Sequence, residues 1–81
     1  MPRPTQLPFS GTRLARLRAR AGLTNAELAE RCGQLGHPVH HTTLGKLERG
    51  VQMPRPGLPP VLAEALDVEL DDLLDDARAA G

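Results

Sequence analysis

Two short segments of this chain carry polar side chains suited to hydrogen bonding with phosphates and base edges; one opens with Thr24 and Asn25, and the other spans residues 41–49. A helix over 41–49, turning about 100° per residue, would separate an aliphatic side from a polar, basic side. The polar side holds His41, Thr42, Gly45, Lys46 and Arg49. Such a helix can pack on a protein core and still lie in the major groove of DNA. The same pattern also fits a surface helix with a solvated polar side, so the neighbouring elements and the charge must decide.

Local signals predict that the first segment starts a helix. Thr24 and Glu27 have the spacing of a capping box, in which the hydroxyl and the carboxylate each bond a free backbone amide of the first turn. Leu23 and Leu28 have the spacing of a hydrophobic staple across the same turn. We therefore predict a helix over about residues 25–32.

The second segment has similar signals at both ends. Val39 and Leu44 repeat the staple spacing around His40, which takes the N-cap position although histidine is a weaker cap than serine or aspartate. Gly50 can end the helix in a left-handed turn. The prediction is a helix over 41–49, preceded by a loop over 33–38 that is rich in turn residues.

Three further helices would complete a core. Ser10 can cap a helix over about 11–21. Pro59 and Pro60 fit the first turn of a fourth helix, because the amides that proline lacks have no helical partner there. A fifth helix is predicted over about 70–78, where leucines and aspartates recur at helical spacing. The sequence thus predicts an all-α, compact five-helix domain.

The chain has 81 residues and a single Phe, Phe9, with no Tyr or Trp, which suits one small domain with a modest aliphatic core. We predict a disordered arm over 1–9, which contains three prolines, a folded domain over 10–76 and a flexible end over 77–81. The sequence has one cysteine, no signal peptide and no apolar run long enough to span a membrane. A reducing, cytoplasmic location is therefore expected.

Charge is divided between the two parts of the chain. Residues 1–55 contain nine Lys and Arg against three acids, a net charge of +6. Residues 56–81 contain seven acids against Arg78, a net charge of −6. This asymmetry, hidden by a formal net charge of zero, indicates a polyanionic partner for the first part. The acidic end could repel DNA, aid solubility or dock on a basic protein surface, and the sequence leaves these alternatives open.

The order of these motifs resembles the Cro/repressor-like helix-turn-helix family, also called XRE. The resemblance covers about residues 11–74, through Leu17-Arg18, Gly22-Leu23-Thr24, Glu27-Leu28-Ala29, Thr42-Thr43-Leu44, Leu47-Glu48-Arg49-Gly50, Pro54, Leu62-Ala63, Leu66, Val68, Leu70 and Leu73-Leu74. It implies a lambda-repressor-like domain that binds double-stranded operator DNA as a homodimer, mostly to repress transcription.

The resemblance also implies roles for individual positions. Positions that read base edges match His41, Thr42, Gly45 and Lys46. Positions that contact or adjoin backbone phosphates match Thr24, Asn25, Arg49, Gln52 and Arg55. Asn25 is shorter than the Gln that the family commonly has. Arg18 and Glu48 match a pair that forms a partly buried salt bridge, which gives Glu48 a structural role.

Two features depart from the family pattern. Residues 34–38 look like an insertion where the family makes a tight turn, which affects the expected placement of the two helices. Pro59 occupies an aliphatic first-turn position of the fourth helix, which is therefore expected to start late.

Metal binding, catalysis and protein docking are the functions other than DNA binding that the residues could suggest. Cys32, His37, His40 and His41 lie within ten residues, but their spacing matches no standard zinc pattern, and Cys32 falls on the apolar side of its helix. The chain has no nucleophile–base arrangement, no glycine-rich phosphate loop and too little core for a substrate pocket. We expect no metal, no cofactor and no enzymatic activity. The remaining alternative is a protein-interaction module, such as an antitoxin, that docks through its acidic C-terminal helix.

Overall fold

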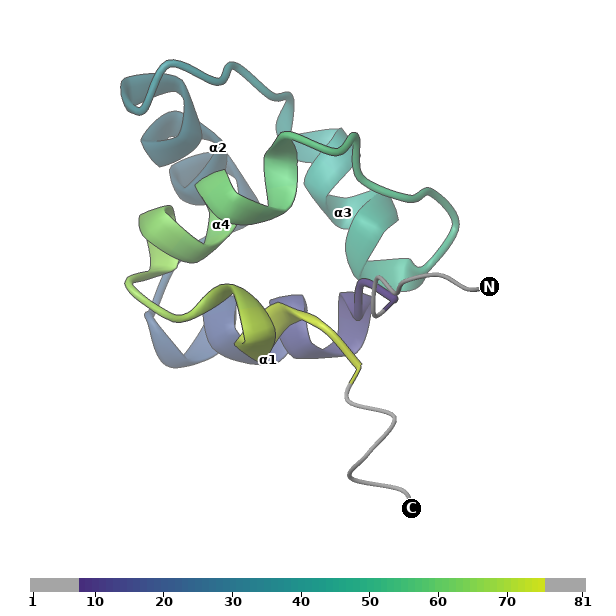
Figure 1. Ribbon diagram of the computed structural model, residues 1–81. Helices are drawn as coiled ribbons and strands as arrows, with labels where there is room; N and C mark the ends of the chain where they lie inside the picture. Colours follow the sequence, from purple (N-terminus) through teal and green to yellow (C-terminus); the bar gives the residue numbers. More distant parts are fainter. Residues whose placement is uncertain (1–7, 76–81) are drawn as a thin grey trace.

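The computed structural model describes residues 8–75, which form four α-helices and one short 3₁₀ helix (Figure 1). In chain order these are α1 (Gly11–Arg20), α2 (Asn25–Gln34), α3 (His41–Arg49), α4 (Leu58–Leu66) and η1 (Leu70–Leu73). The described residues contain no β-strand, and Phe9 and Leu74 form an isolated antiparallel bridge. The all-α prediction is therefore confirmed, whereas the number of five α-helices is not. No helix among the described residues is long and apolar enough to cross a membrane.

The predicted helix starts are found where the capping signals lie. Ser10 accepts a hydrogen bond from the amide of Arg13 at 3.1 Å and caps α1. Proline occupies the first turn of α4, as predicted. The helix α2 runs two residues further than predicted, to Gln34. It ends there because Gly36 takes a positive φ of 87°, a conformation that glycine adopts without steric cost.

An aliphatic core lies between the helices. Its fully buried side chains are Leu14, Leu28, Cys32, Leu44, Leu47, Leu62 and Leu73. The predicted core position of Cys32 is confirmed, and burial raises the pKa of its thiol. The start of α1 lies so close to the end of α3 that a Cβ atom on Gly11 would overlap the carbonyl oxygen of Leu47. Gly11 therefore permits a close approach of two helices, a role that the sequence alone did not indicate.

The prediction of a fifth helix over 70–78 is wrong in its described part, and residues 76–78 lie outside the described residues. Only Leu70–Leu73 form a helical turn, after which Leu74 is extended with ψ of 144°. The carbonyl oxygen of Leu73 accepts a hydrogen bond from the amide of Ser10, and the amide of Asp75 donates to the carbonyl oxygen of Pro8, both at 2.8 Å. These long-range bonds take the backbone groups that a continuing helix would pair internally.

Of the predicted arm over 1–9, only Pro8 and Phe9 lie within the described residues. Phe9 packs, partly buried, against the core, and its bridge to Leu74 joins the two ends of the described chain. The predicted flexible end over 77–81 lies outside the described residues.

Candidate nucleic-acid interface

The two sides of α3 differ in exposure as the sequence predicts. Leu44 and Leu47 are 0% and 1% exposed. On the opposite side, His41, Thr42 and Lys46 are exposed to solvent. The helix therefore packs on the core by its aliphatic side and leaves three of the four predicted base-reading residues exposed.

The described acidic segment lies away from this polar side. The 3₁₀ helix η1, with Asp71 and Asp72, packs against α1 and α4, as Figure 1 shows. Asp71 and Asp72 thus belong to an element that packs on α1 and α4, and His41, Thr42 and Lys46 stay exposed.

The start of α2 meets the middle of α3 at Gly45. A Cβ atom on Gly45 would lie 3.5 Å from Nη1 of Arg49 and 3.8 Å from Nδ2 of Asn25. Three predicted DNA-contacting residues are thereby brought together where the two helices cross. Gly45 is half-buried, and a side chain at this position would point toward Asn25 and Arg49. Oδ1 of Asn25 is buried there without a hydrogen-bond partner among residues 8–75.

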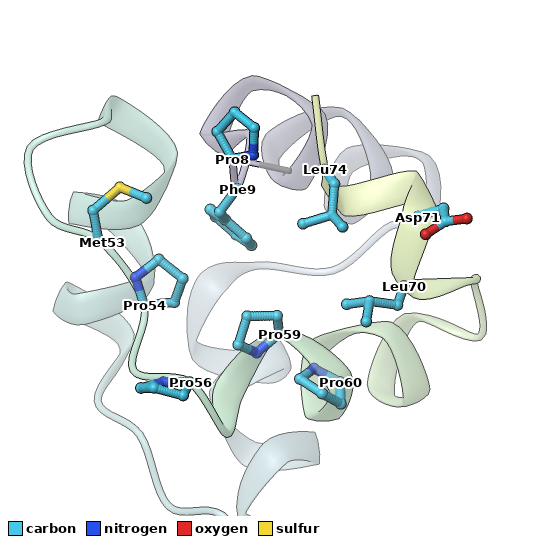
Figure 2. Close-up of a pocket in the computed structure, with 10 residues that line it drawn as sticks. All are labelled: Pro8, Phe9, Met53, Pro54, Pro56, Pro59, Pro60, Leu70, Asp71 and Leu74. Carbon is cyan, nitrogen blue, oxygen red and sulfur yellow. The ribbon is translucent and has the colours of Figure 1, made fainter. Parts of the chain in front are cut away.

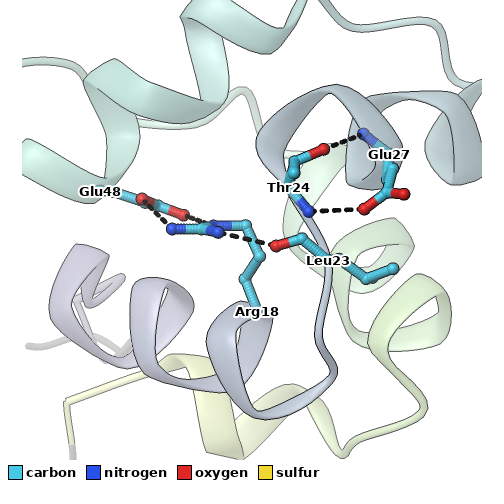
Figure 3. A network of polar contacts seen from close by, with 5 residues as sticks. All are labelled: Arg18, Leu23, Thr24, Glu27 and Glu48. Atoms are coloured by element: carbon cyan, nitrogen blue, oxygen red, sulfur yellow. Dashed lines mark hydrogen bonds and ion pairs between the residues drawn. The ribbon is translucent and has the colours of Figure 1, made fainter.

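The first turn of α2 keeps hydrogen-bond donors available. The capping box is present: Oγ1 of Thr24 accepts from the amide of Glu27 at 3.1 Å, and Oε1 of Glu27 accepts from the amide of Thr24 at 2.8 Å (Figure 3). Two of the four unpaired amides of a helix start are satisfied in this way, which leaves those of Asn25 and Ala26. The oxygen of Thr24 only accepts in this box, so its hydroxyl proton can still be donated. Amides at a helix start favour an anion.

The connection between α2 and α3 does not separate the two helices. Gln34, the first residue of the apparent insertion, continues α2, and the turn then closes through bonds of 2.9 Å from Gly36 to Gly33 and from His37 to Cys32. The ring of His37 lies 3.6 Å from the place of a Cβ atom on Gly57, just before α4. The extra residues therefore fold toward the start of α4, and α2 still packs on α3.

The predicted ion pair between Arg18 and Glu48 is present and bidentate (Figure 3). Nε and Nη2 of Arg18 donate to Glu48 at 2.5 and 3.2 Å, and Nη1 donates to the carbonyl oxygen of Leu23 at 2.7 Å. The two side chains are 22% and 12% exposed. The hydrogen bond to Glu48 raises the pKa of Arg18 despite its partial desolvation. The pair ties α1 to α3 and to the turn before α2, which is a structural role.

The start of α3 contains a contact that the sequence did not predict in full. Nδ1 of His40 lies 3.2 Å from the amide nitrogen of Thr42 and 2.8 Å from its hydroxyl oxygen. The ring of His40 also stacks on that of His41, with centroids 4.4 Å apart. The sequence feature that could have indicated this contact is a histidine at an N-cap position, two residues before a threonine.

The remaining predicted phosphate-contacting residues, Gln52 and Arg55, are exposed in the linker between α3 and α4. The same linker forms one side of an apolar groove of about 580 Å³ (Figure 2). Phe9, Pro59 and the η1 residue Leu70 also line the groove. Among residues 8–75, no group of three or more His, Cys, Asp or Glu side chains is arranged to hold a metal ion.

A family model described as a helix-turn-helix domain matches residues 11–77, which include all four α-helices. The chain belongs to this helix-turn-helix family, and the match is consistent with the resemblance to Cro/repressor-like proteins. A search of curated proteins found no match. Membership of the family indicates a DNA-binding regulator.

Proposed function

We propose that this protein is a sequence-specific transcriptional regulator, acting as a repressor, whose α3 lies in the major groove. The observation that carries the proposal is the division of α3 into a buried aliphatic side and an exposed polar side. In this arrangement Lys46 donates to the acceptor edge of a guanine, and the methyl group of Thr42 contacts a thymine methyl. His41 lies at the N-terminal end of α3, and the absence of a side chain at Gly45 lets the start of α2 lie close to α3.

Phosphate contacts on both sides of α3 would hold the helix in register. The free amides at the start of α2, with Thr24 and Asn25, form an anion site on one side. Arg49 lies beside that site, and Gln52 and Arg55 extend the polar surface into the linker. We infer that residues 10–76 form the DNA-binding domain.

We further propose that the regulator binds as a homodimer to a palindromic operator. A single α3 spans only a few base pairs, so two copies are needed for a site of useful length. The half-sites would lie about 34 Å apart, one turn of the duplex, if both α3 helices enter the same face.

Selection of duplexes from a random pool tests this proposal. The expected result is an enriched palindrome whose affinity falls steeply with added salt, because phosphate contacts release counterions. Recovery of no preferred sequence, at any salt concentration that permits binding, would contradict the proposal.

A protein-docking function is the second candidate, and the groove favours it. Met53 and Leu70, at 63% and 39% exposure, give the groove an apolar surface, and the acidic side chain of Asp71 also lines it. Docking would use this groove and η1 in place of the acidic C-terminal helix expected from the sequence. Apolar docking would respond little to salt, so the same titration separates the two functions.

A further inference from the structure

His40 is the N-cap residue immediately before α3, and its side chain is hydrogen-bonded to Thr42 in the first turn of that helix. Its backbone is extended, with φ of −85° and ψ of 146°, as an N-cap requires. From this position its Nδ1 atom faces both the amide nitrogen and the hydroxyl oxygen of Thr42, at 3.2 and 2.8 Å. Nδ1 of His40 is thus within hydrogen-bond distance of two polar groups of Thr42.

The hydrogen bond from the amide of Thr42 to Nδ1 of His40 assigns the protons of this group. A backbone amide can only donate, so Nδ1 of His40 must be the acceptor and the ring proton must lie on Nε2. An unprotonated Nδ1 cannot donate to the hydroxyl of Thr42. The hydroxyl then turns its own proton toward Nδ1, and the amide and the hydroxyl share the single lone pair of that nitrogen.

This assignment changes what Thr42 offers to a duplex. With its proton committed to His40, the hydroxyl presents only lone pairs, and the side chain is held in one orientation with its methyl group. In the major groove, adenine and cytosine present amino donors and thymine presents a methyl group, whereas guanine presents only acceptors. A committed Thr42 therefore matches adenine, cytosine or thymine and repels the acceptor edge of guanine.

We propose that His40 is a positioning residue for base recognition: it makes Thr42 an acceptor and excludes guanine at the base that Thr42 faces. The stacked ring of His41 rests on the same anchored imidazole, so His40 fixes two predicted base-reading residues at once. This inference rests on the proposed DNA-binding function, and it adds a specificity residue that does not itself contact the base.

The test compares His40→Ser with the parent protein on duplexes that carry each base pair at the position read by Thr42. Serine is a stronger N-cap, so α3 should keep its stability, but the imidazole acceptor is lost and the hydroxyl of Thr42 is released. We expect guanine at this position to gain about fivefold in relative affinity, as for one neutral hydrogen bond. Affinity for an unrelated duplex should stay within about twofold, since the phosphate contacts are unchanged.

A double-mutant comparison distinguishes positioning from a merely structural role. Thr42→Val keeps the shape and a methyl group but removes the hydroxyl, so adding His40→Ser to Thr42→Val should not further alter the preference at the base that Thr42 faces. An equal effect of His40→Ser in both backgrounds, or a uniform loss on all duplexes, would overturn the proposal.

The free protein provides a measurement that does not depend on DNA. Nitrogen NMR of the His40 ring at mildly alkaline pH should show the proton on Nε2, with the hydroxyl proton of Thr42 slowed in its exchange. A proton on Nδ1 would overturn the proposal even if the protein binds DNA selectively. If the expected ring state is found but the parent selects no sequence, the proposed function fails and the recognition role of His40 fails with it.

Discussion

The helix pair α2–α3 and the C-terminal segment 70–75 both show helical periodicity in sequence, but only the first folds as predicted. In α2 and α3, side chains cap each start, and Gly36 and Gly50 follow each end. The C-terminal segment has a capping box between Glu69 and Asp72 but no stop signal, and its backbone pairs with residues 8–10 instead. Periodicity thus sets the buried side, whereas the competition for backbone hydrogen bonds sets the length of the element.

The two regions also differ in what they expose. The exposed side of α3 presents hydrogen-bond donors and the positive charges of Lys46 and Arg49, whereas Leu44 and Leu47 on its other side are buried. The C-terminal segment presents carboxylates beside exposed apolar side chains such as Leu70. A small domain can in this way keep the surface proposed to bind DNA apart from an acidic and apolar one.

The largest effect on stability is expected at the contact between α1 and α3. In Gly11→Ala the new Cβ atom would overlap the carbonyl oxygen of Leu47 and lie 2.8 Å from that of Glu48, so whole helices must shift. We expect a loss of about 3 kcal/mol in the free energy of unfolding, the upper end for overpacking, measured by urea denaturation.

Gly33 provides the matched control, because it lies within α2 with nothing within 4 Å of an added Cβ atom. Gly33→Ala should stabilise the protein by about 0.5–1 kcal/mol. Equal effects of the two substitutions would contradict the close approach of α1 and α3.

Loss of the ion pair should come next in size. Glu48→Ala leaves the guanidinium of Arg18 without its carboxylate partner, and we expect a loss of about 2–3 kcal/mol, typical of a hydrogen bond to a charged group in a partly exposed site. Glu48→Gln retains an acceptor and should lose less. If thermal and urea denaturation show no difference between Glu48→Ala and the parent, the pair does not contribute to stability.

On the side of α3 proposed to face DNA, substitutions of Lys46 and of Arg49 should have different effects on DNA binding. Lys46→Ala should cost about 1–3 kcal/mol and relax specificity at one base pair, because Lys46 is proposed to read a base edge. Arg49→Ala should weaken binding to all duplexes similarly and lower the salt dependence by about one phosphate contact. Binding titrations on single-base variants at several salt concentrations measure both effects, and identical profiles would refute the separate roles.

The smallest effect on the free energy of unfolding is expected in the C-terminal segment. It distinguishes the extended backbone at Leu74 from the helix over 70–78 that the sequence predicted. Asp75→Pro removes one amide that bonds Pro8, and the extended Leu74 before it suits a proline, so we expect a loss of about 1 kcal/mol. In the interior of a helix over 70–78 the same substitution would cost about 3 kcal/mol. Asp75→Ala, which keeps the amide, serves as the control in urea denaturation.

Prediction from sequence succeeded where the determining groups are neighbours in the chain. The capping box at Thr24 and the exposed side of α3 follow from spacing alone, and the pairing of Arg18 with Glu48 followed from the family resemblance. The close approach at Gly11 and the pairing of Phe9 with Leu74 depend on residues far apart in sequence, which spacing cannot report. His40 lies between these cases, because its position was visible but the orientation of its ring was not.

Guanine methylation interference on the duplex selected from the random pool tests most directly whether α3 lies in the major groove. The N7 atom of guanine lies in that groove, so we expect methylation of specific guanines to block binding of the parent protein. In Lys46→Ala one of these guanines should become insensitive. Binding that tolerates N7 methylation at every guanine, by a protein that still selects its sequence, would contradict the placement of α3.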